Sequence, residues 1–477
     1  MSTSSAKPAP KLVVEKVPFG GYYQRDVPAP DDDEIMRTGP GTPLGELFRR
    51  FWQPVCLSEQ IKDLPLAIRI MSEDLVVFRD GEGRIGLLNR HCAHRGASLE
   101  YGIVEQRGLR CCYHGWHYDI DGTLLEAPGE PEHSPLPKRI CQGAYPAFER
   151  DGLVFAYMGP PDKKPQFPVN ESYVRPTNKP VPLSNYFPCN WLQVQENIPD
   201  VAHTALFHNG PGNASLRAKR ATETAFPAPW AEMPVLLHYE VSGGKGTLLP
   251  AIRRLGDNVW VRMNYHSAPN HIDLGTLFND GKSEFYFHRV CFNRWVVPHD
   301  DESSTIFGWR HFNDFEDVGK GDPSKLGVEA PTDFLGGQIG GRPYDIAQRD
   351  PGDWDVISSQ RKMSRHSLEN LGTTDAGVAM WRRVVRKAVR GESPGVLPAP
   401  MQPGQPLFSE PQRTYCQDSV MRIPPLPDKA ADREMLRDIG KRVAEIMLAA
   451  DEYPPGNERD AAIVRQLKAL HQEYLKA

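Results

Sequence analysis

Two cysteine–histidine motifs constrain the fold of this chain more than any other feature. Residues 91–96 read HCAHRG and residues 111–116 read CCYHGW, so a C-x-H motif precedes a C-x-x-H motif by a short interval. With 8 Cys and 15 His in 477 residues, two such pairs seldom fall so close together by chance. Gly96 and Gly115 permit each loop to curl closely around a metal. We expect each loop to present two metal ligands.

The candidate ligands of this site are Cys92, His94, Cys111 and His114. One structural Zn²⁺ would suit them, because thiolates and imidazoles in a tetrahedron are its usual environment. A [2Fe–2S] cluster is the alternative, with two Cys on one iron and two His on the other. The residue types do not choose between these metals. By its spacing, we expect Cys112 to be a packing residue rather than a ligand.

A second pair of histidines lies farther along the chain. His203 and His208 are five residues apart in the segment ENIPDVAHTALFH, which we expect to be helical from Pro199 to a Gly-Pro terminator just after His208. Asp200 and His203 share a helical face at i,i+3. His203 and His208 do not share one, so a common metal requires the helix to distort or end. Taken alone, two His beside a Gly-Pro break are more often capping or surface residues.

Both segments resemble motifs of one protein family. The pattern C-x-H-R-G followed by C-x-Y-H-G-W resembles the cluster-binding motif of Rieske proteins. The second segment resembles the E-N-x-x-D-x-x-H-x-x-x-x-H pattern of Rieske non-heme iron oxygenases. The resemblance runs from Gly39 to the region of Asp353 and is strongest to the phthalate-dioxygenase-like branch, which includes vanillate- and dehydrodivanillate-type O-demethylases. The N-terminal arm and the last helices are its least diagnostic parts.

The resemblance implies two iron centres in one chain. The ligands of a [2Fe–2S] cluster would be Cys92, His94, Cys111 and His114. His203 and His208 would bind a mononuclear Fe(II) together with an acid far along the chain. Asp353 is the best match for that acid and Asp355 is the second choice. Two imidazoles and one carboxylate leave adjacent iron positions open for dioxygen.

Two further residues receive roles from the same resemblance. Asp200 would connect His114 at the cluster of one subunit to His203 at the iron of the next. A carboxylate can do this by accepting a hydrogen bond from the N–H of a histidine whose other ring nitrogen binds metal. Asn197 would lie near the iron without binding it tightly. Contacts of this kind must close into a ring, so we expect a homotrimer or a pair of stacked trimers.

The activity implied by the resemblance is that of a terminal oxygenase acting on an aromatic carboxylate. Oxidative O-demethylation of a methoxylated aryl acid is the first expectation, and cis-dihydroxylation or monohydroxylation of a phthalate- or phenoxybenzoate-like ring is the alternative. The sequence has no flavin or nicotinamide fingerprint, so electrons from NAD(P)H would come through a separate flavin-containing reductase, with or without a ferredoxin. A Rieske electron carrier and a zinc-binding scaffold are the competing classes. Arg262, Arg289 and Arg294 lie on expected strands and could bind a carboxylate, but receive no role.

Prolines and β-type runs divide the chain into five segments. Hairpin signals at Asp80-Gly81 and Asp121-Gly122 indicate a β domain early in the chain. We expect the second domain to be helix-grip-like, an antiparallel sheet plus helices, which makes the chain α+β. Its β-rich stretches are expected at 259–266 and 285–297, and apolar residues at helical spacing predict a helix over 375–389 capped by Asp375. The expected segments are an N-terminal arm (1–40), an all-β Rieske domain (41–160), a Pro-rich linker (161–184), a catalytic mononuclear iron domain (185–427) and C-terminal helices (428–477).

Composition excludes several other classes of protein. The chain has 56 Lys+Arg against 61 Asp+Glu, and a net charge of −5 disfavours a nucleic-acid partner. No apolar run reaches the roughly 18–20 residues of a membrane helix. No secretory signal is visible, so we expect a soluble cytoplasmic protein. Eight Cys are too few for a disulfide scaffold of this length.

Overall fold

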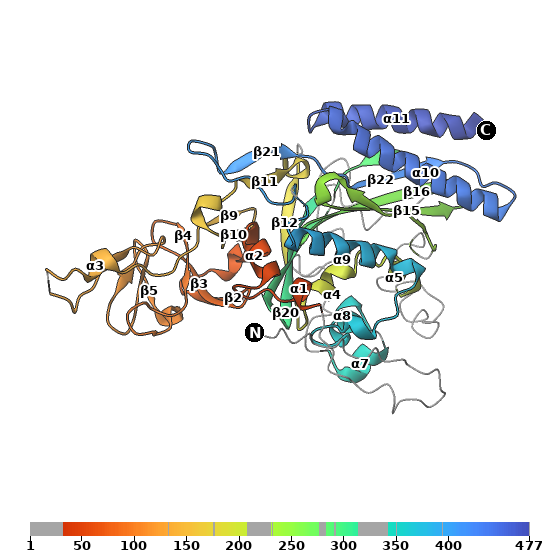
Figure 1. Ribbon diagram of the computed structural model, residues 1–477. Coiled ribbons are helices and arrows are strands. Elements are labelled where there is room, and N and C mark those ends of the chain that lie inside the picture. Colours follow the sequence, from red (N-terminus) through yellow and green to blue (C-terminus); the bar gives the residue numbers. More distant parts are fainter. Residues whose placement is uncertain are drawn as a thin grey trace, which may run out of the picture.

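The structure, a computed structural model, describes residues 32–131, 133–174, 177–207, 230, 232–275, 283–290, 292–312, 342–349, 351–393 and 395–476. The chain is an α+β protein, as predicted, with a small β domain at one end, a large antiparallel sheet in the middle and two long helices packed on that sheet (Figure 1). Within these ranges, every helix is too short or too polar to span a bilayer.

The N-terminal domain is a set of small antiparallel sheets. Its strands are β1 (Trp52–Leu57), β2 (Leu66–Ile70), β3 (Glu73–Arg79), β4 (Ile85–Asn89), β5 (Ile103–Val104), β6 (Leu109–Arg110), β7 (His117–Tyr118), β8 (Leu124–Glu126), β9 (Ala147–Arg150) and β10 (Leu153–Tyr157). β3 and β4 form the hairpin predicted around Asp80-Gly81, and β7 and β8 flank the turn predicted at Asp121-Gly122. The short helices that accompany this framework are α1 (Asp33–Met36), α2 (Pro43–Arg49) and α3 (Leu136–Arg139).

Ten strands form the large sheet of the second domain. In chain order they are β12 (Lys179–Phe187), β13 (Val235–Leu236), β14 (Tyr239–Val241), β15 (Gly246–Leu255), β16 (Asn258–Ser267), β17 (His271–Leu274), β18 (Phe285–His288), β19 (Phe292–Asp300), β20 (Ser303–Phe312) and β22 (Gln417–Arg422). The main spatial order is β12-β20-β19-β17-β16-β15-β13, with β14 paired to β15 and β22 paired to both β16 and β18. The β-rich stretch expected from Phe285 to Val297 is therefore two separate strands, β18 and β19.

The Pro-rich segment predicted as a linker also contributes strands. β11 (Phe167–Asn170) pairs with β21 (Phe408–Gln412), and β12 starts inside the segment. β12 accommodates Pro180 and Pro182 because it lies at the edge of the sheet. No strand pairs with its outer side, so a proline that lacks an N–H there costs no hydrogen bond between strands. The segment thus anchors the second domain as well as connecting it to the first.

Side chains alternate along β16 and give the large sheet two different faces. Val261 and Met263 pack in an apolar core with residues of α10 (Lys429–Ala449) and α11 (Asn457–Lys476). Arg262 and His266 point to the opposite face. The helices on that side are α4 (Trp191–Glu196), α5 (Val201–Leu206), α8 (Asp353–Ser359) and α9 (Ala376–Val389) (Figure 1). A short helix, α7 (Tyr344–Arg349), precedes α8 in the chain. The predicted helix after Asp375 and both predicted C-terminal helices are present.

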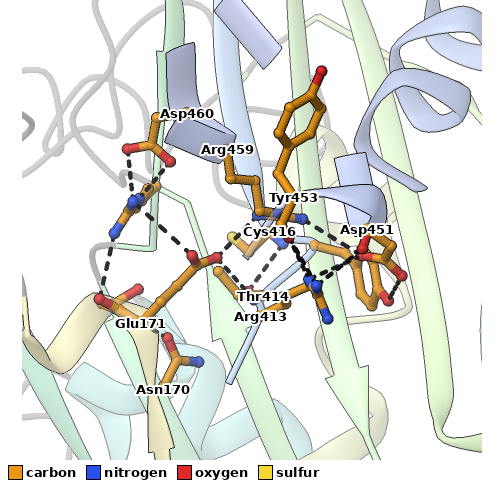
Figure 2. A network of polar contacts seen from close by, with 12 residues as sticks. Asn170, Glu171, Arg413, Thr414, Cys416, Asp451, Tyr453, Arg459 and Asp460 are labelled. Atoms are coloured by element: carbon orange, nitrogen blue, oxygen red, sulfur yellow. Dashed lines mark hydrogen bonds and ion pairs between the residues drawn. The ribbon is translucent and has the colours of Figure 1, made fainter. Parts of the chain in front are cut away.

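A network of buried charges attaches α11 to the segment that leaves the N-terminal domain. Glu171 follows β11 and is buried, and its Oε1 accepts hydrogen bonds from Arg459 Nη1 at 3.0 Å and from the Thr414 N–H at 3.1 Å (Figure 2). Arg289 donates from Nε to Asp460 Oδ1 at 3.1 Å and lies 3.9 Å from Glu171 Oε2. The Glu171 carboxylate therefore forms ion pairs with two buried guanidinium groups, those of Arg459 and Arg289.

We expect Glu171→Gln to destabilise the fold, because the neutral amide leaves Arg459 and Arg289 buried with too little negative charge. Loss of one partner of a buried ion pair costs about 3–5 kcal/mol. The measurement is the urea midpoint of unfolding. Glu302→Gln is the matched control, since Glu302 pairs with Lys362 where the side chains are 55% and 71% exposed, and such pairs contribute less than about 1 kcal/mol. Equal midpoints for the two variants would contradict the role of the network.

Candidate functional site

The two cysteine–histidine loops have the same backbone geometry. In each loop the glycine N–H donates to the carbonyl of the candidate ligand cysteine, from Gly96 to Cys92 at 2.8 Å and from Gly115 to Cys111 at 3.1 Å. Both glycines have positive φ, 75° and 72°, a conformation that residues with a Cβ adopt only at a cost. The sequence prediction that glycines permit these curled loops agrees with this geometry.

The loops bring the two predicted histidines together. The rings of His94 and His114 have centroids 4.6 Å apart, and Trp116 stacks on His94 at 4.5 Å with an interplanar angle of 4°. His94 Nδ1 is buried and has no hydrogen-bond partner among the described residues. A buried imidazole nitrogen without a partner is the feature expected of a metal ligand. This pair of rings therefore fits one half of a cluster site.

The two predicted cysteines form the buried half of the site. Cys92 and Cys111 are each 3% exposed and belong to the small apolar core of the domain. Burial raises the pKa of the Cys92 thiol, and the neighbouring Cys111 adds to this rise. Tyr118 Oη lies 3.1 Å from Cys92 Sγ. Cys112 is exposed, so the prediction that it is a packing residue is wrong.

The second site is centred on His203 in α5. His203 Nδ1 donates to the backbone carbonyl of Asp200, so the lone pair of this ring lies on Nε2. His203 Nε2 is 3.7 Å from Asp353 Oδ1 and 3.3 Å from Asn197 Nδ2. Residues 150 positions apart in the sequence thus meet at one imidazole nitrogen. The Nε2 lone pair and the carboxylate could both bind a metal.

The helix that carries His203 is shorter than predicted. α5 begins at Val201, and Asp200 precedes it with φ −79° and ψ 71°, outside the helical region. Pro199 is therefore not the first helical residue, because Asp200 turns its carbonyl back to the His203 ring. Burial raises the pKa of the Asp200 carboxyl, the nearby Asp375 adds to the rise, and His203 opposes it. The predicted second ligand, His208, lies outside the described residues.

The two candidate acids of α8 have different partners. Asp355 Oδ2 accepts the Gly352 N–H at 2.7 Å and forms an ion pair with Arg342. Asp353 instead faces His203, as described above. Asp355 therefore caps the start of α8, and Gly352 occupies the N-cap position.

No three His, Cys, Asp or Glu side chains of the described residues form a group that could hold a single metal ion. The cluster candidates are a thiol pair and an imidazole pair, and the second site has His203 and Asp353 in place. Beside α5 lies an open hollow of about 510 Å³. It is lined by Asp200, Ala202, His203, Leu206, Phe207, Thr374 and Asp375.

Two buried arginines near this site, Arg382 and Arg294, are not marked by any local sequence motif. Arg382 of α9 donates to both carboxylate oxygens of Glu196, at 2.6 and 2.7 Å, just before Asn197. Arg294 of β19 is buried, and its Nε and Nη2 atoms have no hydrogen-bond partner in the part of the chain described. Long-range pairing of strands and helices creates both environments, so a single sequence does not reveal them.

Comparison with known proteins supports the family resemblance seen in the sequence. Residues 51–142 match the model of the Rieske [2Fe-2S] domain. The chain is 46% identical to the tert-butanol monooxygenase / tert-amyl alcohol desaturase oxygenase subunit of Aquincola tertiaricarbonis, over 94% of this chain and 95% of that protein. It is 33% identical to the phenoxybenzoate dioxygenase subunit alpha of Ectopseudomonas oleovorans, over 81% and 91%. It is 31% identical to the 5,5'-dehydrodivanillate O-demethylase oxygenase subunit of a Sphingobium species, over 77% and 83%.

Solved structures share the fold at lower identity. A crystal structure of dicamba monooxygenase bound to dicamba aligns with a TM-score of 0.52 and 18% identity, over 72% of this chain and 98% of that one. NdmA of Pseudomonas putida aligns with a TM-score of 0.54 and 21% identity, over 76% and 99%. These likenesses support the predicted α+β architecture with its N-terminal Rieske domain.

We expect Tyr118→Phe to lower the reduction potential of the cluster-loaded protein. A ligand thiolate only accepts hydrogen bonds, so Tyr118 would donate to Cys92, and hydrogen bonds to the sulfurs help to set the potential. A loss of about 1 kcal/mol corresponds to a shift on the order of 40 mV for one electron. Redox titration of the visible absorption measures it. Tyr113→Phe, at a 60% exposed side chain, is the control, and equal potentials for both variants would contradict the prediction.

Proposed function

The chain belongs to the Rieske non-heme iron oxygenases, and from this premise we propose that it hydroxylates an aryl carboxylate, with oxidative O-demethylation of a methoxylated acid as its main reaction. The cofactors are a [2Fe–2S] cluster and a mononuclear iron, with electrons from a separate reductase. The proposal depends above all on His203, whose Nδ1 is bound to the Asp200 carbonyl while Nε2 faces Asp353 and Asn197.

The residues present fit both cofactors. The loops would hold the cluster through Cys92, His94, Cys111 and His114. His203 Nε2 and the Asp353 carboxylate would hold the iron, with His208 as the further ligand that the motif spacing suggests. When bound, such an iron supplies the activation of dioxygen. Asn197, 3.3 Å from His203 Nε2, would stay close to the metal without taking a ligand position.

The reaction balances with one molecule of O₂, two electrons and two protons. One oxygen atom enters a C–H bond of the methoxy group, and the other leaves as water. The hemiacetal formed on the substrate then loses formaldehyde and leaves a phenol. If the ring carbon lies nearest the metal instead, the product is a hydroxylated ring. The task of the protein is therefore to hold the substrate in one orientation.

The arrangement of the two sites favours electron transfer between chains. The cluster loops belong to the domain at one end of Figure 1, whereas α5 lies beside α9 on the side of the molecule away from that domain. His114 is partly exposed, and Asp200 lines the open hollow beside His203. Asp200 of one subunit would accept a hydrogen bond from His114 of its neighbour, and closure of such contacts gives a trimer or stacked trimers. A flavin-containing reductase, with or without a ferredoxin, would supply the electrons.

Arg294 supports an acid as the substrate. Burial lowers the pKa of Arg294 to about 10, and the Asp353 charge opposes this shift, so the guanidinium remains protonated at neutral pH close to the iron ligand. Arg289 is paired with Asp460, and Arg262 donates to the Gly275 carbonyl and lies 4.5 Å from the centroid of the Trp230 ring. Of the three arginines singled out in the sequence, Arg294 is the one for which both Nε and Nη2 lack a hydrogen-bond partner among the described residues, which supports it as the partner of a substrate carboxylate.

A tertiary alcohol is a second candidate substrate. The oxygenase subunit that is 46% identical over almost the whole chain carries tert-butanol and tert-amyl alcohol in its name. Both candidates need the same iron site. An aryl carboxylate would bring a negative charge to Arg294, whereas a tertiary alcohol would not.

We expect the protein with a reductase to release formaldehyde from methoxylated aryl acids, and Asp353→Asn to abolish this release. The amide is a poor iron ligand, so this variant should retain cluster iron and lose the mononuclear iron. Asp355→Asn is the matched control on the same helix and should keep both. Iron and formaldehyde analysis of the three proteins decides the assignment. Retention of the mononuclear iron in Asp353→Asn with loss in Asp355→Asn would make Asp355 the ligand.

We expect Arg294→Met to lower kcat/KM for aryl carboxylates about 100-fold. Loss of one partner of a buried charged hydrogen bond costs about 3 kcal/mol, and each 1.4 kcal/mol or so is a factor of about ten. Turnover of a tertiary alcohol should fall far less, because a neutral hydroxyl does not need the charge. Arg422→Met, at a side chain that is 64% exposed, is the control. Equal losses for acid and alcohol would contradict a carboxylate anchor.

A further inference from the structure

A short turn between α4 and α5 contacts both ring nitrogens of His203. α4 ends at Glu196, and the Asp200 N–H donates to the Glu196 carbonyl at 3.2 Å, which closes the turn. Asn197 in this turn places Nδ2 3.3 Å from His203 Nε2, and the Asp200 carbonyl at its end accepts from His203 Nδ1. The orientation of the imidazole therefore follows the conformation of this turn.

Helix α9 holds the turn at its first residue through a buried ion pair. Arg382 Nε and Nη2 donate to the two carboxylate oxygens of Glu196 at 2.6 and 2.7 Å, and the two side chains are 7% and 10% exposed. Arg382 also donates to Glu369 at 2.6 and 3.2 Å. A guanidinium with two carboxylate partners has little freedom to rotate, so it fixes the end of α4.

The same helix holds the turn at a second point. A Cβ at Gly377, in the first turn of α9, would lie 2.7 Å from the Pro199 carbonyl oxygen. This approach is closer than a side chain tolerates, so glycine is what permits the helix to lie directly against the turn. Glu196 and Pro199 bracket Asn197 and precede Asp200. Both supports of the turn therefore come from one helix.

We infer that Arg382 of α9 is a positioning residue of the mononuclear iron site, which holds the imidazole of His203 in its binding orientation through Glu196 and the turn that follows. This inference rests on the proposed function, because it concerns the metal that His203 would bind. Partners that orient a metal-bound histidine typically change metal affinity by about 10–100-fold when they are removed.

The test is the Fe(II) affinity of cluster-loaded protein from which the mononuclear iron has been removed. Glu196→Gln keeps the size of the side chain and removes its charge, and Arg382 keeps Glu369 as a partner. We expect the Fe(II) dissociation constant to rise about tenfold or more, and the electron paramagnetic resonance spectrum of the nitric oxide adduct to broaden. Glu240→Gln is the matched control, because Glu240 pairs with Lys387 of the same helix at 2.8 and 3.0 Å.

Gly377→Ala tests the contact between α9 and the Pro199 carbonyl without changing any charge. If Glu196→Gln does not fold, this variant alone tests the inference. It should also weaken Fe(II) binding while the visible spectrum of the cluster is retained. An Fe(II) dissociation constant unchanged in both variants would overturn the inference and leave the ion pair a purely structural feature. Wild-type protein that binds no Fe(II) would instead overturn the proposed function, and the inference with it.

Discussion

The alternation of side chains across the large sheet is the constraint on which the other features depend. Along β16, Val261 and Met263 enter the apolar core beneath α10 and α11, so their neighbours must face the other way. That second face carries Arg262 and His266, which are nevertheless buried because helices cover it. Buried polar groups need partners or they cost free energy. The apolar face thus stabilises the sheet, and the polar face leaves groups available for a ligand.

Two of the helices that cover this polar face are too short to be stable by themselves. α4 and α5 have six residues each, well below the roughly 12–15 that an isolated helix needs. Tertiary contacts must therefore fix them. Gln193 of α4 donates to the carbonyls of Ile357 at 3.0 Å and Arg361 at 2.9 Å, at and just beyond the end of α8. This link sets the separation between the helix that carries Asp353 and the turn that leads to His203.

Local patterns in the sequence predicted the parts of the molecule that local interactions determine. The curled loops, the hairpin at Asp80-Gly81 and the helix after Asp375 depend on neighbouring residues, and the structure contains them. The start of α5 was wrong because the Asp200 carbonyl binds the His203 ring instead of continuing the helix. Arg382 and Arg294 acquire their surroundings only when distant strands and helices meet. Their roles therefore require the three-dimensional structure.

The electrostatics of the polar face supports the proposal of an acid substrate. Burial lowers the pKa of His266 to about 3, so this ring is neutral and offers no charge to an anion or a cation. His266 and Arg294 lie in one row across the sheet, each paired with Ile272, and so project to the same side. A neutral alcohol would bring no negative charge to Arg294, and the Asp353 carboxylate, which favours the charged form of Arg294, would bind the iron. A carboxylate substrate would neutralise that charge, and the neutral His266 ring, two strands away in the same row, adds no repulsion.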